Sequence, residues 1–223
     1  MRRLGTCLVL LLGLYSTRAQ AQVNVAQTVA DRLRDGTITV SDVPYDGTDV
    51  RWGRATALID ARPDVVMRIV TDYARYAEFL PHFRVSRVLS QRGTSALVYL
   101  EAVVIHNTTT LWSQMRIRPR PDVGPTHVIE ANMDRGNVDR MAARWEVTPV
   151  DNGQRTIVTF QFIIEPDVPF PDAIITDQTL RAARRTLESL RTRVILPEFV
   201  AQPAIGPSPS AAALAAPSGP ACS

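Results

Sequence analysis

The sequence contains only two cysteines, Cys7 and Cys222, and they lie near opposite ends of the 223-residue chain. Lysine is absent, so all 25 basic residues are arginine. Cysteines placed in this way predict no stabilising intrachain disulfide, and a hydrophobic core must hold the fold together.

The three histidines, His82, His106 and His127, are far apart and lack the spacing of metal ligands. We therefore expect no metal.

The sequence also lacks the short motifs that mark several enzyme classes. It has no Gly-x-Ser-x-Gly, no Cys-x-x-Cys, no phosphate-binding loop and no dinucleotide fingerprint. Nothing in it therefore favours a serine hydrolase, a dithiol oxidoreductase or a nucleotide-dependent enzyme. We expect no cofactor.

Residues 1–21 have the pattern of a secretory signal peptide. Arg2 and Arg3 precede the almost entirely apolar run 8–14, and Ala19-Gln20-Ala21 fits the small-x-small cleavage rule. The apolar run is shorter than the roughly 20 residues that a stable membrane-spanning helix needs. We expect an exported protein, periplasmic or secreted, whose mature chain begins near Gln22. An uncleaved N-terminal anchor is the alternative.

Cleavage at this point would change the charge of the protein. The first 21 residues carry Arg2, Arg3 and Arg18 and no acidic residue, which leaves 22 arginines against 22 acidic residues. A mature chain without net charge gives no support for a nucleic-acid partner.

The rest of the chain divides into a patterned part and a biased tail. Residues 201–223 are rich in Ala, Pro and Ser and carry no charged side chain, so we expect them to be disordered. Helical spacing predicts a helix over 25–34 and two short helices from Pro63 and Arg75. Alternating or apolar runs between turn residues predict the following strands: 37–43, 51–60, 83–90, 96–105, 108–118, 127–133, 142–148 and 155–164. Short turns between successive strands favour antiparallel pairing, and Pro119 and Pro121 are expected to end the strand before them.

A long helix is predicted after Pro166, Pro169 and Pro171, and it is expected to end at about Glu198. One narrow face of it is apolar and includes Ala183 and Leu187, whereas the opposite face is rich in arginine. The apolar face must be buried, and the sheet is the only large partner for it. The arginine face is either simply solvated or makes a transient contact with acidic lipid headgroups.

Three segments and their order resemble one known group of proteins. The first two are Ala57-Leu58-Ile59-Asp60-Ala61-Arg62-Pro63 with Val65-Val66, and Val70-Thr71-Asp72-Tyr73-Ala74-Arg75-Tyr76 with Phe79-Leu80-Pro81. The third comprises Gly136, Ala143-Arg144-Trp145-Glu146-Val147-Thr148-Pro149, Thr156-Ile157-Val158 and Pro169-Phe170-Pro171. Together they resemble the START-like superfamily, which includes the polyketide cyclase/dehydrase and coenzyme Q-binding groups.

This resemblance implies an α+β helix-grip fold, in which a curved antiparallel sheet wraps around the long C-terminal helix. It places a START-like domain at residues 50–200, preceded by an extension of one helix and one strand at 22–49. It also implies a cavity for an apolar molecule between the sheet and the helix, and the superfamily contains both carriers and enzymes.

Strand alternation and the helix pattern identify the side chains that would line this cavity. They are Val98, Leu100, Ala102, Val104, His106, Ser113, Met115, Trp145, Phe160, Phe162, Thr179, Ala183 and Leu187. The competing interpretation is that these residues are ordinary core. His106 is the one weak candidate for an acid–base group, and a histidine bonded to backbone or water at a strand end is the alternative. Asp72 fits a helix cap or turn better than a catalytic acid.

Three functions remain open. The first, which we favour, is an exported monomer that is not an enzyme and holds a lipid, isoprenoid or polyketide-like ligand. The second is a cyclase or dehydrase acting on an apolar substrate in the same cavity, with His106 as its acid–base group. The third is a ligand-free module that binds a protein partner through Trp112 beside Arg116.

Overall fold

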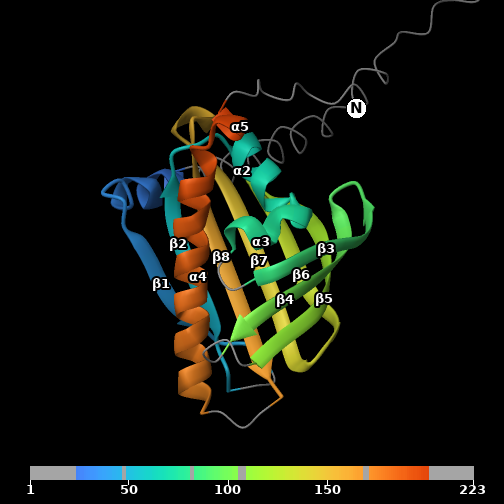
Figure 1. The fold of residues 1–223 in the computed structure, drawn as a ribbon. Helices are drawn as coiled ribbons and strands as arrows, with labels where there is room; N and C mark the ends of the chain where they lie inside the picture. The colour runs from blue at the N-terminus through green and yellow to red at the C-terminus, as the bar shows by residue number, and fades with distance from the viewer. Residues whose placement is uncertain (1–23, 47–48, 81–82, 105–108, 168–170, 201–223) are drawn as a thin grey trace, which may run out of the picture.

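The computed structural model describes residues 24–46, 49–80, 83–104, 109–167 and 171–200 (Figure 1). An N-terminal helix occupies residues 24–32. The elements that follow are β1 (Ile38–Val43), β2 (Trp52–Ile59), α2 (Pro63–Val70), η1 (Tyr73–Arg75), α3 (Tyr76–Phe79), β3 (Phe83–Arg92), β4 (Ser95–Val104), β5 (Thr109–Val123), β6 (Thr126–Gly136), β7 (Val138–Val150), η2 (Asp151–Gly153), β8 (Arg155–Pro166), α4 (Asp172–Val194) and α5 (Pro197–Val200).

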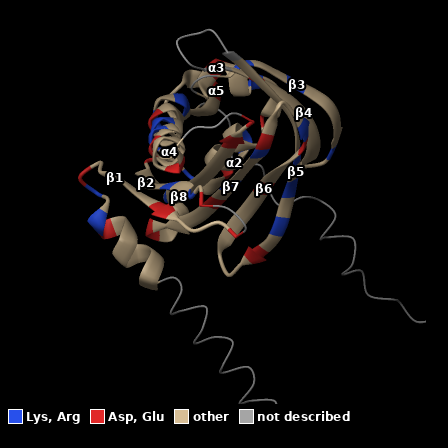
Figure 2. Ribbon diagram, turned by 90° about the horizontal axis from the view of Figure 1, so that it is seen from below, with Lys and Arg blue, Asp and Glu red and all other residues tan. Residues whose placement is uncertain are grey.

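The strands of the described chain form one antiparallel sheet. Its order is β1-β2-β8-β7-β6-β5-β4-β3, with eight strands among the described residues. Strands β3 to β8 are sequential neighbours, as expected of strands joined by short turns, whereas β2 pairs with β8 and brings the start of the domain beside its end. Seen along its strands, the sheet curves around α4, α2 and α3 (Figure 2). The predicted α+β helix-grip fold is confirmed.

Small residues on β2 allow α4 to lie close to the sheet. Gly53, Ala55 and Ala57 face the helix, and the two alanines are fully buried. A Cβ atom added at Gly53 would lie 2.3 Å from both the carbonyl carbon and the carbonyl oxygen of Thr179, which is far below van der Waals contact. Glycine is therefore required at this crossing, because the backbone of α4 occupies the space of a side chain.

Arginines on α4 hold the edge of the sheet. Arg191 donates hydrogen bonds to the carbonyl oxygens of Gly36 and Leu58, and Arg184 donates to that of Ile38. Part of the arginine face that the sequence suggested as solvated or lipid-facing therefore contacts backbone carbonyls beside and within β1 and β2.

Two predicted boundaries were wrong. Strand β5 continues through Pro119 and Pro121 to Val123. Ile117 is the last residue of β5 that pairs with β4, so beyond it β5 bonds only to β6. On the side of β5 that has no neighbouring strand, the N–H that a proline lacks would have had no partner, so nothing is left unsatisfied. The long helix ends at Val194 instead of Glu198, and Pro197 then opens the separate short helix α5.

Candidate functional site

The concave side of the sheet and the apolar face of α4 enclose the main hydrophobic core. Val98, Met115, Trp145 and Phe160 contribute to it from four strands, and α4 contributes Ala183, Leu187 and Leu190. The rings of Trp145 and Phe160 pack with their centroids 4.3 Å apart. This core is the region in which the sequence predicted a ligand cavity.

Burial differs between the two halves of the concave face. On β5 to β8, one half of each strand carries a deeply buried residue, namely Ile117, Ile129, Val147 and Val158. This half lies towards α2, which covers the upper part of the sheet (Figure 1). The other half also carries partly exposed apolar residues on the same four strands, namely Leu111, Met133, Ala143 and Phe162, whereas Ser113 and Met141 in this half are buried. We call these four residues the open row.

The structure brings together most of the residues that the sequence proposed for the cavity. Leu100, Ser113 and Thr179 are buried along with the core residues named above, and Phe162 is partly exposed. Ala102 pairs with Leu111 at the edge of the open row and is also partly exposed. His106 and the side chain of Val104 lie outside the described residues. A ligand-binding role for the set stays a prediction.

The hydroxyls of Ser113, Thr179 and Thr186, which are described and buried in this interior, all have hydrogen-bond partners. The hydroxyl of Ser113 donates to Sδ of Met141 at 3.2 Å. Thr179 and Thr186 donate back to helix carbonyls, those of Thr176 at 2.8 Å and Ala182 at 2.9 Å. Hydroxyls that are bonded within their own helix contribute little to orienting a ligand.

Two buried tyrosines lie beside α2 and α3. The Tyr73 hydroxyl donates to the carbonyl of Thr94 at 2.7 Å, and that of Tyr76 donates to Val70 at 2.6 Å. Burial raises the pKa of Tyr73 to about 12 and that of Tyr76 well above its ordinary value. Both groups stay protonated at neutral pH and are poorly suited to act as a general base.

The C-terminal end of α4 is closed by an ion-pair cluster. Arg193 is 8% exposed and lies 2.7 Å from the carboxylate of Glu78 on α3. Its guanidinium lies 5.4 Å from the ring centroids of both Phe79 and Phe199. The cluster therefore ties α3 and α5 to the last turn of α4.

Sequence reasoning missed part of the site. Met133 and Leu111 belong to the open row, and Met141 receives the hydrogen bond of Ser113. Alternation along β6 and β7 was a usable signal for the two methionines, whereas the partial exposure of Met133 depends on where α2 and α4 end over the sheet. Asp72 lies at the turn before η1 and makes no capping bond with its side chain, which is 3.7 Å from Arg75.

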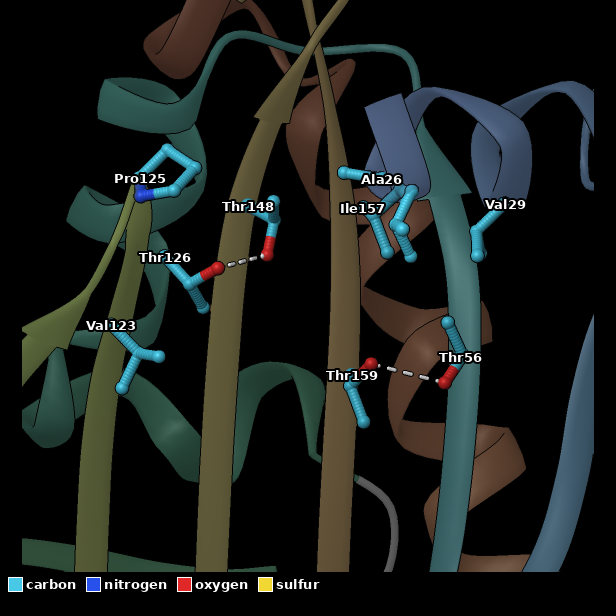
Figure 3. A pocket seen from close by; sticks show the side chains of 10 residues that line it. Ala26, Val29, Thr56, Val123, Pro125, Thr126, Thr148, Ile157 and Thr159 are labelled. Carbon is cyan, nitrogen blue, oxygen red and sulfur yellow. Dashed lines mark hydrogen bonds between the residues drawn. The ribbon is translucent and has the colours of Figure 1, made fainter. Parts of the chain in front are cut away.

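A separate groove of about 520 Å³ lies on the convex side of the sheet (Figure 3). One wall is the N-terminal helix, with Val25, Ala26 and Val29, and Val123 and Pro125 form the other. Ile157 and four threonines form the floor, and the threonines bond in pairs, Thr56 with Thr159 at 3.0 Å and Thr126 with Thr148 at 2.8 Å. The residues predicted to line a ligand cavity face the other side of the sheet.

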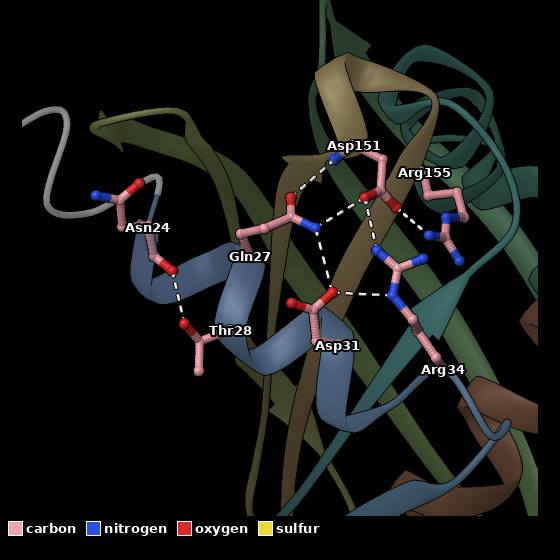
Figure 4. Close-up of polar contacts among 7 residues, drawn as sticks. All are labelled: Asn24, Gln27, Thr28, Asp31, Arg34, Asp151 and Arg155. Carbon is pink, nitrogen blue, oxygen red and sulfur yellow. Dashed lines mark hydrogen bonds and ion pairs between the residues drawn. The ribbon is translucent and has the colours of Figure 1, made fainter.

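A polar network holds the N-terminal helix against the sheet (Figure 4). The carboxylate of Asp151 accepts hydrogen bonds from Gln27 at 2.8 Å and Arg34 at 3.0 Å, and it pairs with Arg155. The bond from Gln27 is the largest of the influences that lower the pKa of Asp151. Beneath the network, Ala30 and Leu33 of the helix region pack on Leu58, Val150 and Ile157.

Within the described ranges, no group of three or more His, Cys, Asp or Glu side chains could hold a metal ion. None of the described helices is long and apolar enough to cross a membrane.

Comparison with solved structures identifies the fold. A STAR-related lipid transfer protein from Xanthomonas axonopodis aligns with a TM-score of 0.62 and 17% identity, over 71% of this chain and 94% of that one. Human StAR-related lipid transfer protein 5 gives 0.58 and 10%, over 80% and 97%. A START superfamily protein from Mycobacterium smegmatis gives 0.56 and 15%, over 64% and 96%.

Comparison at the level of sequence gives the family. No curated protein matches the chain significantly. The family described as polyketide cyclase/dehydrase and lipid transport matches residues 59–191, which run from the end of β2 through most of α4. The resemblance seen in the sequence is thus confirmed, and the chain belongs to the polyketide cyclase/dehydrase and lipid transport family.

Proposed function

We propose that this protein binds a hydrophobic small molecule in the interior of the helix grip, between the concave face of the sheet and α4, and that it acts as a carrier or holder of that molecule. The observation that carries the proposal is the open row. Leu111, Met133, Ala143 and Phe162 continue the core across four strands, yet their side chains are only partly buried. Apolar surface inside a curved sheet is a suitable lining for an apolar ligand.

The chemistry of the open row favours a neutral ligand. Its four side chains carry no charge, and the hydroxyl of Ser113, on the same strand as Leu111, is occupied by Met141. Burial of about 250 Å² of ligand surface would contribute about 6 kcal/mol before the cost of immobilisation is subtracted. A lipid, isoprenoid or polyketide-like molecule meets these requirements.

The comparisons support the same class of ligand. The family description includes lipid transport, and two of the similar structures are described as lipid transfer proteins. The described interior offers two hydrogen-bonded tyrosines with raised pKa values as its titratable groups near α2, which favours binding over acid–base catalysis.

Export is the second part of the proposal. It is supported by the basic start, the apolar run and the small-x-small site within residues 1–21. N-terminal sequencing of the protein isolated from its own host tests it directly. A mature start near Gln22 supports export, and an intact Met1 in the cytoplasmic fraction contradicts it.

The binding proposal is tested by native mass spectrometry with lipid extraction of the protein from its own host. We expect a co-purifying apolar molecule in near-stoichiometric amount. An Ala143→Phe variant should reduce this occupancy at least tenfold, because the new ring fills the open row. Ala74 is exposed on η1, so Ala74→Phe is the matched control and should keep its ligand.

A second measurement covers the case in which Ala143→Phe does not fold. Leu111→Ala enlarges the open row and should alter the thermal shift that quinones, fatty acids or sterols produce. An apo mass for the wild-type protein, together with no thermal shift from any of these compounds, would contradict the proposal.

A further inference from the structure

The convex groove is a preformed site on the side of the sheet away from the proposed ligand cavity. Its first wall, the N-terminal helix, is fixed by the Asp151 network and by the packing of Ala30 and Leu33. A rigid groove binds an extended segment without first spending free energy on its own ordering. Two of its side chains are exposed apolar residues on opposite walls, Val25 at 65% and Val123 at 55%.

The lining of the groove selects an uncharged occupant. None of its ten residues carries a charge. In each threonine pair, one hydroxyl donates to the other, so one hydroxyl proton per pair remains available to an acceptor. The groove therefore fits a segment that is apolar, neutral and rich in hydrogen-bond acceptors.

Residues 201–223 of the same chain have this chemistry. They carry no charged side chain, and five of the 23 residues are proline, which offers a carbonyl acceptor but no N–H donor. Ile205 and Leu214 provide larger apolar side chains among the alanines. Each proline removes one N–H donor that the groove would otherwise leave unsatisfied.

The segment also starts in a suitable place. It follows α5. The last turns of α4 lie near the end of the N-terminal helix, as the hydrogen bond from Arg191 to the carbonyl of Gly36 shows. Fully extended, 23 residues reach about 75 Å, which exceeds the roughly 40 Å diameter of a domain of this size. The segment can therefore pass around the sheet edge to the convex face.

From these observations we propose that residues 201–223 dock in the convex groove between the N-terminal helix and the β5–β6 turn, and cover Val25 and Val123. The site takes an uncharged, proline-rich segment of this chain. It is independent of the interior ligand cavity, which lies on the concave face.

Cys222 provides the test. In the full chain with Cys7→Ser, a Val123→Cys substitution places a thiol at the groove, and Leu89→Cys is the matched control at an exposed apolar position of β3. Under mild oxidation, an intrachain disulfide between positions 123 and 222 should form at least tenfold faster than one between 89 and 222. The control is needed because a tether alone gives a high effective concentration anywhere on the surface. Equal rates at the two positions would overturn the proposal.

A second measurement does not depend on crosslinking. Deletion of residues 201–223 should shift the amide resonances of Thr56, Thr126, Thr148 and Thr159, and a synthetic peptide of 201–223 added to the truncated chain should restore them. Shifts confined to the residues next to Val200 would overturn the proposal. Crosslinks at position 123 that appear only between two chains would also overturn it, because the occupant would then be the tail of a second copy.

Discussion

The guanidinium of Arg193, in the last turn of α4, lies 2.7 Å from the carboxylate of Glu78 on α3. It therefore joins the end of the gripped helix to the short helices over the sheet. Arg75 bonds to Glu78 and to Glu198 on α5 at 2.8 Å, so two arginines share two acidic residues. The aromatic rings of Phe79 and Phe199 flank Arg193 and exclude water from part of it.

Substitution of Arg193 should destabilise the fold more than substitution of its partner. Arg193→Met removes a buried side chain together with its ion pairs and ring contacts, and we expect a loss of about 1–3 kcal/mol. Glu78→Gln keeps the shape of a half-exposed side chain and should cost only about 0.5–1 kcal/mol. Urea unfolding at pH 7 measures both, and equal losses would contradict the structural role given to Arg193.

The Gly53 crossing predicts a second stability effect. Gly53→Ala should lower the free energy of unfolding by at least about 2 kcal/mol, because its Cβ would displace the backbone of α4 at Thr179. Gly153 has space around it but a φ of +80°, so Gly153→Ala should cost about 1 kcal/mol from backbone strain alone. Denaturant unfolding of both variants gives the comparison, and a smaller loss at Gly53 would contradict the close approach of α4.

The Asp151 network should make stability depend on pH. The pKa of Asp151 is lower in the folded protein than its ordinary value, so its contribution is fully present above about pH 4–5 and is lost as the pH falls through the folded pKa. Asp151→Asn keeps a residue that tolerates the positive φ of this position but removes the charge. The wild type should be more stable than Asp151→Asn at pH 7, and this difference should shrink towards pH 3. Urea midpoints at pH 7, 5, 4 and 3 measure it, and a difference independent of pH would contradict the assignment.

Carrier and enzyme differ in what they require of His106. If the protein only holds its ligand, His106→Ala should change the affinity for that ligand by less than about threefold, since a neutral hydrogen bond contributes little net free energy. A cyclase or dehydrase would instead keep its ligand but lose turnover of it. Titration with the co-purified molecule, followed by mass analysis after incubation, separates the two, and a new product formed only by the wild type would establish catalysis.

The sequence predicted the fold well because its periodicities were strong. Alternation on β2 and β8 and the narrow apolar face of α4 each specify which side must be buried, and together they permit one arrangement. The end of β5 was mispredicted, because whether a proline ends a strand depends on the neighbour it would have bonded, and Pro119 lies beyond the last β4 partner. Such information depends on sheet register and is absent from local pattern.

The site was less predictable than the fold. Inward-facing residues such as Met115 and Phe160 followed from alternation, but the difference between Val158, fully buried, and Phe162, partly exposed, depends on how far the helices extend over the sheet. The convex groove escaped prediction altogether. Its walls come from the N-terminal helix and the β5–β6 turn, which are about 100 residues apart in the chain and show no shared motif.

The contacts of Arg191 and Arg184 with the backbone near β1 reach residues that lie before the region matched by the family. The family match starts at Ile59 and stops at Arg191, yet the carbonyls that these arginines hold belong to Gly36, Ile38 and Leu58. A fragment trimmed to the matched region would lose β1 and nearly all of β2, and would leave an open edge on β8 and two arginines without acceptors. The region that matches the family is therefore smaller than the sheet it belongs to, because β1 and most of β2 lie before it and complete one edge of that sheet.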